Sequence, residues 1–359
     1  MSTSVEPAAS LGVSVGAAGP VEETKARGQW ELAFIRFRKD KLAVASLVFI
    51  VSLFIVAFIG APVVSHLVGH GPNDIFGTAV SDTQVPVGPW SHIDSAPYPG
   101  APCPVSVPGG VNPCGASGHY SVDLFVLGAD GPLGRDLFLR LLYGAQTSLY
   151  VAVLATLGAV MLGVIMGLLA GYLRGWIDTV VSRLIEIIMV FPFLLFIIAL
   201  RIVAGDTLKN ITLGFLPPGV FTLVLIFSAF GWFYPARIMR GVVFSLREKE
   251  FIEAARMTGA SDLRIMRSHL VPHLVGPIVV YSSLIVATNI IGEAGLSFLG
   301  LGIDQPVSSW GNILAAAPDY YVLAPLLMVW PGLAILMTTL AFNLLGDGLR
   351  DAIDPRARV

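Results

Sequence analysis

Long apolar runs separated by short polar segments fill most of this 359-residue chain. A run of about 20 apolar residues is long enough to cross the hydrocarbon core of a bilayer as a helix. The pattern predicts six such spans, near residues 42–65, 147–172, 184–204, 220–243, 274–296 and 321–345. Only 13% of the residues are charged, against about 25% in soluble domains. We therefore expect an all-α integral membrane protein.

Helix-breaking residues inside the spans need an explanation. Pro192, Pro235 and Pro277 fall in the third, fourth and fifth spans, where we expect tolerated kinks, because neighbouring helices can satisfy the freed carbonyls. The second span carries a spaced series of small residues that suits close approach of another helix. These residues are Gly158, Gly163, Gly167 and Gly171.

The basic residues predict the orientation of the spans. If the N-terminus is inside, most of the 22 Lys and Arg residues fall on the inner side: before the first span, in the loops after the second and fourth, and after the last. The excess of inner Lys and Arg predicts two cytoplasmic termini and a multi-pass protein of the cytoplasmic membrane. The net charge of −2 offers no sign of a nucleic-acid partner.

The same reading divides the chain into segments. Residues 1–29 read as a disordered cytoplasmic tail, and residues 30–65 as an interfacial helix, or a frayed lead-in, followed by the first span. The remaining segments are a Pro/Gly-rich extracytoplasmic insert at 66–127, a helical core at 128–345 containing a cytoplasmic loop at 244–272, and a cytoplasmic tail at 346–359.

The insert carries the chain's two cysteines and several histidines. We expect irregular structure or short strands here, with Cys103 and Cys114 as a candidate disulfide in an exported loop. The alternative is a pair of unpaired thiols. His66 and His70 have the spacing of two ligands on one helical face, but solvated loop histidines are commoner, and we predict no metal site.

A polar, basic stretch, EAARMTGASDLRIMRSHLVP, occupies residues 253–272 between two spans. It predicts a short helix over residues 251–258, a turn at Gly259, which enters the left-handed region without a Cβ penalty, and a second helix capped by Ser261. Ala254 and Ala255 would form a low face that another protein can approach, with charge beside it from Glu253 and Arg256. An ordinary basic loop that binds anionic lipid is the alternative.

Four strings resemble one family together. They are LGADGPLGRDLFLRLLYGAQTSL at residues 127–149, the 253–272 stretch, EAGLSFLGLGIDQPVSSWGNIL at residues 293–314, and FNLLGDGLRDAIDPR at residues 342–356. They are similar to the C-type permease subunits of bacterial dipeptide, oligopeptide and nickel ABC importers. Ala129 stands where that family usually has Thr, and the Cys-containing insert is longer than usual.

The resemblance implies a type I ABC importer permease fold and a division of labour. Glu253, Ala254, Ala255 and Gly259 match the family's EAA motif, with Arg256 and Pro272 in the same loop; this loop would dock on a cytoplasmic ATPase subunit. Partners would be a homologous B-type permease subunit, one or two ATPase subunits that bind ATP and Mg, and an extracytoplasmic substrate-binding protein.

The expected activity is ATP-driven import of short peptides, with no catalytic, cofactor-binding or metal-binding residue on this chain. The sequence has no GxxxxGK[ST] phosphate loop of its own. Alternatives are import of nickel or another small solute, or a secondary transporter, which would predict inverted repeats or midplane ionisable residues.

Three polar residues are candidates for the transport pathway. Asn289 and Glu293 lie toward the outer end of the fifth span; they would line the path or receive the binding protein, or lie in an ordinary hydrated interface. Glu186 lies in the third span, where a buried charge is functional by default. The competing interpretation of Glu186 is an ion pair with Arg183, three residues earlier.

Overall fold

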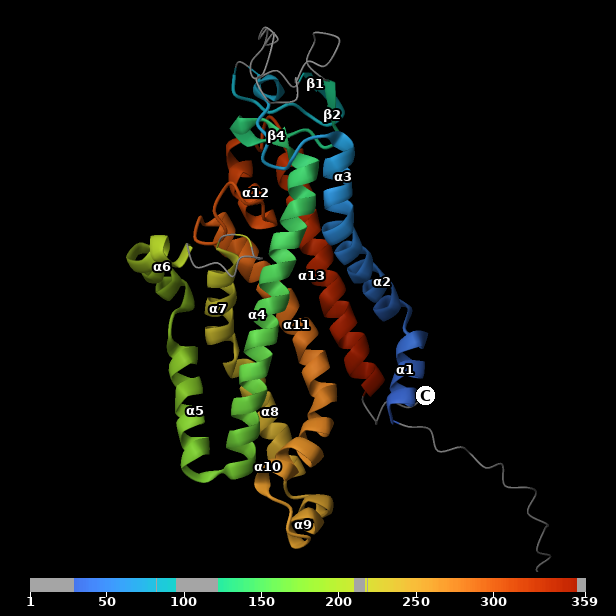
Figure 1. Cartoon of the computed structure of the whole chain (residues 1–359), viewed down its shortest axis with the longest axis vertical. Coiled ribbons are helices and arrows are strands. Elements are labelled where there is room, and N and C mark those ends of the chain that lie inside the picture. The colour runs from blue at the N-terminus through green and yellow to red at the C-terminus, as the bar shows by residue number, and fades with distance from the viewer. Residues whose placement is uncertain (1–28, 82, 95–121, 210–216, 218, 354–359) are drawn as a thin grey trace, which may run out of the picture.

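A computed structural model describes residues 29–81, 83–94, 122–209, 217 and 219–353. Figure 1 shows an elongated bundle of helices, with short strands at one end and helix α9 at the other. Residues 1–28 of the predicted N-terminal tail and both cysteines, Cys103 and Cys114, lie outside the described residues.

The secondary structure is dominated by helices. These are α1 (Gln29–Lys39), α2 (Lys41–Ile55), α3 (Ala61–Val68), α4 (Leu137–Leu173), α5 (Gly175–Val190), α6 (Phe193–Lys209), α7 (Val220–Gly231), α8 (Phe233–Leu246), α9 (Glu250–Met257), α10 (Asp262–Ile265), α11 (Val271–Phe298), α12 (Trp310–Ala316) and α13 (Leu326–Ile353). The strands are β1 (Ser91–Asp94), β2 (Val122–Phe125), β3 (Ala129–Asp130) and β4 (Arg135–Asp136).

Four continuous helical segments of the described chain are long and apolar enough to cross a membrane, and two bent pairs raise the total to six if each pair is one span. The four are Lys41–Val68, Leu137–Leu173, Asp262–Phe298 and Leu326–Ile353. They correspond to the first, second, fifth and sixth predicted spans. The first three extend beyond both predicted ends, and the sixth begins later than predicted, at Leu326, and ends later, at Ile353.

The third and fourth predicted spans are the bent pairs, so the expected tolerance of Pro192 is wrong. The axis turns by 79° between α5 and α6, because the residue before a proline avoids the α region: Phe191 is extended, with ψ of 125°. Helices α7 and α8 meet at 40°. The ring of Pro235 excludes the carbonyl four residues earlier, at Gly231, where α7 ends.

Helix α4 begins at Leu137, ten residues before the predicted start of the second span. Asp136 caps it: its Oδ1 accepts hydrogen bonds from the backbone N–H groups of Phe138 and Leu139, at 2.8 and 3.3 Å. The predicted close helix packing along the glycine series is confirmed. A Cβ on Gly163 would lie 2.6 Å from Pro235, and one on Gly167 2.6 Å from a backbone oxygen of α8.

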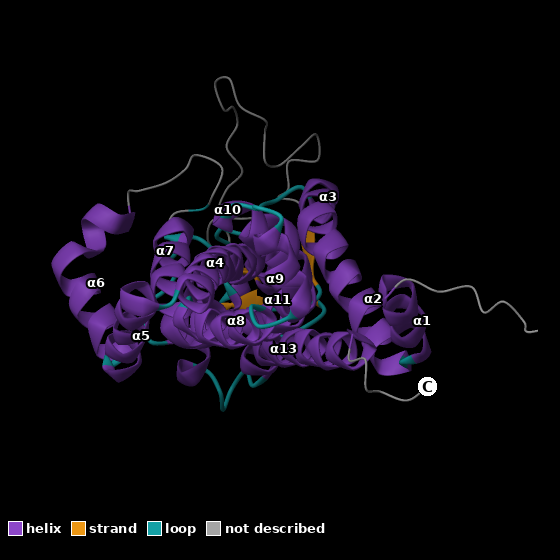
Figure 2. Ribbon diagram, turned by 90° about the horizontal axis from the view of Figure 1, so that it is seen from below, coloured by secondary structure: helices purple, strands orange, loops and turns teal. Residues whose placement is uncertain are grey.

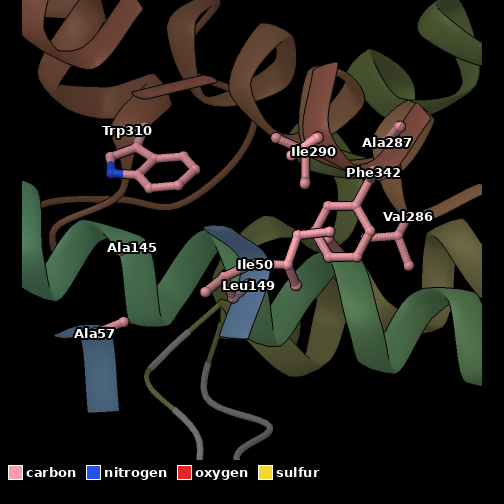
Figure 3. Packing of buried hydrophobic residues seen from close by; sticks show 11 residues of the cluster. Ile50, Ala57, Ala145, Leu149, Val286, Ala287, Ile290, Trp310 and Phe342 are labelled. Carbon is pink, nitrogen blue, oxygen red and sulfur yellow. The ribbon is translucent and has the colours of Figure 1, made fainter. Parts of the chain in front are cut away.

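The first span is held to the helical core by a buried apolar cluster (Figure 3). Ile50 of α2 joins Leu149 of α4, Ile290 of α11, Trp310 of α12 and Phe342 of α13. The Trp310 indole N–H donates to the carbonyl of Leu141 at 3.1 Å. Inside a membrane, such contacts act through van der Waals packing, since lipid is as apolar as the side chains.

Short strands cover one end of the bundle, as predicted for the insert. Strands β1 and β2 pair antiparallel, with Ser91 opposite Phe125, and Phe76 and Phe125 meet edge to face at 5.2 Å between ring centroids. Seen from below, α5 and α6 lie on one side of α4, α8 and α11, and α1 and α2 lie on the other (Figure 2).

Candidate functional site

Helix α9 lies at the end of the molecule opposite the strands (Figure 1). Glu250 and Glu253 occupy its first turn and Arg256 its last, which suits the helix dipole at both ends. Gly259 has φ of +81°, the left-handed conformation predicted from the sequence. The Gly259 N–H bonds to the Arg256 carbonyl at 2.9 Å, and the Ala260 N–H to the Ala255 carbonyl at 3.1 Å, which is a Schellman ending.

The two faces of α9 differ in burial. Ile252 and Ala255 are buried in a cluster that also contains Met239 of α8 and Leu274 of α11. The prediction that Ala254 and Ala255 together form an open face is therefore half wrong. Ala254 is exposed, but Ala255 packs against the chain's own core because adjacent helical residues point about 100° apart.

Apolar side chains that the sequence reasoning did not single out lie exposed beside the charged ones. Met257 is 85% exposed and Leu263 72%; Glu253 and Arg256 are exposed as well. Exposed apolar groups rimmed by charge are typical of protein interaction sites. The available signal was periodicity: Met257 lies two residues after the buried Ala255, on the other side of the helix.

Tyr172, at the end of α4, connects the loop to the bundle. Its hydroxyl donates to the Asp262 carboxylate at 2.7 Å, and its carbonyl accepts from the Arg247 guanidinium at 2.7 Å. The guanidinium carbons of Arg256 and Arg247 lie 5.3 and 5.8 Å from its ring centroid, within cation–π range. Tyr172 thus contacts α9, α10 and the end of α8.

The same end of the bundle holds two further ion pairs. Arg174 pairs with Glu248 at 2.7 Å. Arg240 of α8 binds both carboxylate oxygens of Asp178 on α5, at 2.5 and 3.0 Å. A two-point Arg–carboxylate contact fixes orientation as well as distance, so α5 and α8 are held in register where they approach the loop.

The second half of the loop leads directly into a span. Ser261 occupies the N-cap position of α10, as predicted, but its side chain makes no capping hydrogen bond. After α10 the chain passes through one wider turn, Met266–Leu270, into α11, where Pro272 lies in the first turn. Proline is compatible with that position because its missing N–H is not needed there.

Of the pathway candidates, Glu293 and Asn289 are buried, so the predicted hydrated interface is wrong. Glu293 is 0% exposed and accepts from the hydroxyls of Ser148 and Ser297, at 2.8 and 2.7 Å. The Asn289 amide donates to the Thr156 hydroxyl at 3.0 Å. Both residues tie α11 to α4, because a buried polar group costs free energy unless it is bonded.

Glu186 forms the ion pair that was one of its two predicted roles. Its carboxylate lies 2.6 Å from the Arg183 guanidinium, and both side chains are mostly exposed in this chain. The two spatially separate groups, Glu186 on α5 and the Asn289–Glu293 pair on α11, do not form one site.

A buried charge cluster lies beside the strands. Arg140 pairs with Asp130 and donates to Asn73 at 3.0 Å. Burial raises the pKa of Asp130, against the lowering effect of Arg140. The arrangement joins the insert to the start of α4.

His66 and His70, whose spacing would suit two ligands on one helical face, do not share a helix. Helix α3 ends at Val68, and Gly69 is left-handed, so His70 turns inward to Asp136, with its Nε2 3.1 Å from the carboxylate. Burial also raises the pKa of Asp123, which lies 3.8 Å from the other ring nitrogen. In the part of the chain that the structure describes, no group of three or more His, Cys, Asp and Glu residues could hold a metal ion.

Comparisons with known proteins agree on one family. Residues 159–359 match the "binding-protein-dependent transport system inner membrane component" family, and residues 28–82 match the "N-terminal TM domain of oligopeptide transport permease C". The chain belongs to this family of inner membrane transport components, in its C-type oligopeptide and dipeptide permease branch. It is thus a multi-pass inner membrane permease subunit and not an enzyme.

Individual relatives cover nearly the whole chain. The oligopeptide transport system permease protein OppC of Salmonella typhimurium is 38% identical over 94% of both chains. The dipeptide transport system permease protein DppC of Alkalihalophilus pseudofirmus is 32% identical over 94% of both. The glutathione transport system permease protein GsiD of Escherichia coli is 43% identical, over 63% of this chain and 71% of the relative.

Proposed function

We propose that this chain is the transmembrane permease subunit of an ATP-driven importer of short peptides, and that α9 couples it to a cytoplasmic ATPase. The observation that carries the coupling role is the set of contacts at Tyr172. Hydrogen bonds of 2.7 Å link this end of α4 to α10 and to the end of α8, and the Arg256 guanidinium of α9 lies 5.3 Å from the Tyr172 ring centroid. A displacement of α9 would therefore move spans and not only a loop. The substrate class is supported by the full-length similarity to oligopeptide and dipeptide permeases.

In this proposal α9 docks on the ATPase through its exposed side. The small side chain of Ala254 lets a partner approach closely. The exposed side chains of Met257 and Leu263 provide apolar contacts, and Glu253 and Arg256 provide charges of both signs. Gly259 and Pro272 keep the turn and the start of α11 rigid. Closure of two ATPase subunits around ATP and Mg would move this loop toward its counterpart in a B-type permease subunit, and so change the side of the membrane to which the pathway opens.

The membrane topology belongs to the same proposal. Each bent pair, α5–α6 and α7–α8, counts as one span, which makes six spans with both termini cytoplasmic in a type I permease arrangement. The proposal keeps the order of the predicted segments, from the tail at 1–29 to the tail at 346–359, with the insert at 66–127 outside; the helices run a few residues past some of these bounds, α13 as far as Ile353. There it would meet a substrate-binding protein, and Cys103 and Cys114 would form a disulfide.

The three pathway candidates have different roles in this proposal. Asn289 and Glu293 would act by holding α11 to α4, since their side chains are already bonded. Glu186 stays a pathway candidate.

Reconstitution tests the function directly. The chain is purified with the subunits that accompany it in the membrane and placed in liposomes with the binding protein. ATP-dependent uptake of radiolabelled di- and tripeptides is expected, and binding-protein-stimulated ATP hydrolysis should accompany it. Uptake of nickel with none of peptide would overturn the substrate class, and uptake that follows an ion gradient without ATP would overturn the mechanism.

A further inference from the structure

Arg237 on α8 has an unusual position for a cation. Helices α7 and α8 together form one bent candidate span that ends at Arg247. Arg237 lies ten residues before that end. At 1.5 Å per residue this is about 15 Å into a hydrocarbon core of about 30 Å. Helical side chains lean toward the N-terminus of their helix, which here is away from the cytoplasmic end.

The position of the Arg237 head group agrees with this depth. Its Nη1 lies 4.0 Å from the Met189 sulfur, near the upper end of α5 and the break at Pro192. The cytoplasmic ends of α5 and α8 are marked by the Arg174–Glu248 pair, and Met189 lies fifteen residues beyond Arg174, or about 22 Å along a helix. The guanidinium therefore lies near the middle of the membrane.

Arg237 is exposed and has no anionic partner within the described residues. The acidic side chains of α5 are taken: Asp178 by Arg240 and Glu186 by Arg183. An exposed arginine at mid-membrane depth is costly in lipid, and such residues face a bundle interior or a water-filled path.

Polar neighbours extend the same face outward. Tyr234, one turn along α8 and 50% exposed, stacks edge to face on Tyr281 of α11, at 6.1 Å between ring centroids. Thr288, two turns beyond Tyr281, is also exposed. Residues three, four and seven apart share a helical face, so Thr288, Tyr281, Tyr234 and Arg237 form one polar strip across two spans.

We propose that this polar strip lines the substrate route and that Arg237 binds the C-terminal carboxylate of the peptide in transit. This inference rests on the proposed function and names the group recognised. A carboxylate is the one anion that every unmodified peptide carries, whatever its side chains. The guanidinium matches its two oxygens in a planar, two-point contact, and the hydroxyls of the strip can bond the peptide amides.

The experiment compares uptake of trialanine and trialanine amide by the complete reconstituted transporter. Arg237→Gln should lower trialanine uptake by about tenfold or more, as expected for the loss of a charge-assisted bond, and leave uptake of the amide near the wild-type value. The acid-to-amide ratio is the readout, because the same binding protein delivers both peptides to wild type and variant. Arg237→Lys should retain part of the preference, and the control Arg350→Gln, an exposed arginine at the end of α13, should retain all of it.

An unchanged ratio in Arg237→Gln, or an equal loss of both peptides by an assembled complex, would overturn the inference. If wild type imports neither peptide, the proposed function fails instead. If Arg237→Gln does not assemble, Arg237→Cys is examined with Cys103 and Cys114 replaced by Ser. A membrane-impermeant methanethiosulfonate should modify it, and trialanine should slow the reaction; an unreactive thiol would mean that lipid or a partner subunit covers the position.

Discussion

The hydroxyl of Tyr172 and the carboxylate of Asp262 are joined by a hydrogen bond of 2.7 Å across ninety residues of sequence. Tyr172 ends α4, and Asp262 begins the helical segment that continues into α11. The bond therefore joins the polar loop to α4 at the start of the helical segment that packs against α4, α12 and α13. This hydrogen bond fixes the loop to the helix bundle. Removing it is therefore a way to test whether movement of the loop is transmitted to the spans.

Tyr172→Phe removes this donor and keeps the ring on which Arg256 and Arg247 lie. The loss of one hydrogen bond should cost about 1 kcal/mol, so the protein should still insert and assemble. Because α10, and with it the loop that carries α9, is then held less firmly, we expect less peptide imported per ATP hydrolysed in proteoliposomes. Tyr321→Phe, at an exposed tyrosine, is the matched control. Equal ratios in the two variants would show that the bond does not transmit movement.

Gly259→Val tests the turn after α9. With φ of +81°, a β-branched residue costs about 1–2 kcal/mol or forces the turn to open, and the Schellman bonds would be lost. ATP hydrolysis should become uncoupled from uptake, measured together in the same vesicles, while membrane insertion is unaffected. Gly332→Val is the control, since a Cβ at this helical glycine meets nothing within 4 Å. Wild-type uptake by Gly259→Val would refute the coupling role.

Gly167→Ala tests the close approach of α4 and α8. The new Cβ would lie 2.6 Å from the Ala236 carbonyl oxygen and 2.8 Å from the Met239 Cβ, so the helices must separate. Overpacking of this kind typically costs about 1–3 kcal/mol. The thermal midpoint of the detergent-solubilised complex should fall by several degrees, and Gly332→Ala should leave it unchanged. An equal midpoint in both would indicate that the interface yields easily.

Asp130→Asn tests the buried pair beside the strands. Arg140 is 0% exposed, and losing its carboxylate partner leaves a buried charge, which typically costs about 3–5 kcal/mol. We expect poor accumulation of the variant, measured by membrane yield and by proteolysis of the outer end. Asp130→Asn with Arg140→Met removes both charges of this pair and should recover part of the yield, because the buried Arg135, 3.4 Å from Asp130, still loses its carboxylate. No recovery would mean that Arg135, Asn73 or the shape of the site decides stability.

Asp123→Asn tests the pH dependence of the insert. Burial raises the pKa of the Asp123 carboxyl, partly offset by His70, so the folded state binds this proton more readily than the unfolded state. That contribution to stability is fully present below the ordinary pKa of 3.8 and is lost as pH rises through the folded value. The variant should therefore be at least as stable as wild type at neutral pH and gain less on acidification. A clear loss of stability at neutral pH would show instead that an ionised Asp123–His70 pair stabilises the fold.

Local chemistry accounts for what was predicted correctly from single segments. The apolar runs locate the spans, because crossing a bilayer demands continuous hydrophobic length. Gly259, the glycine series of α4 and the helix at residues 250–257 follow from backbone preference and side-chain size. The length of α4 was underestimated because polar residues at a span's end, such as the buried Arg140, do not interrupt a helix when other elements cover them.

Three features depended on contacts between distant segments. Whether Ala255 faces a partner or the core depends on where α8 and α11 lie. Whether the Glu293 carboxylate is solvated or buried depends on Ser148, which lies in another span. The sequence shows Pro192 but does not show whether neighbouring helices support a small kink there or allow a turn of 79°.

The sequence by itself determined that this is a helical inner membrane permease subunit with a polar loop between spans, because hydropathy and motif spacing are properties of short segments. The tertiary structure alone decided which groups meet: Tyr172 with Asp262, Arg140 with Asp130, Glu293 with its serines. It also left Arg237 exposed beside the Met189 sulfur, without an anion among the described residues. The physical reason is that burial and pairing depend on neighbours brought together from far along the chain, and those neighbours are set by helix packing.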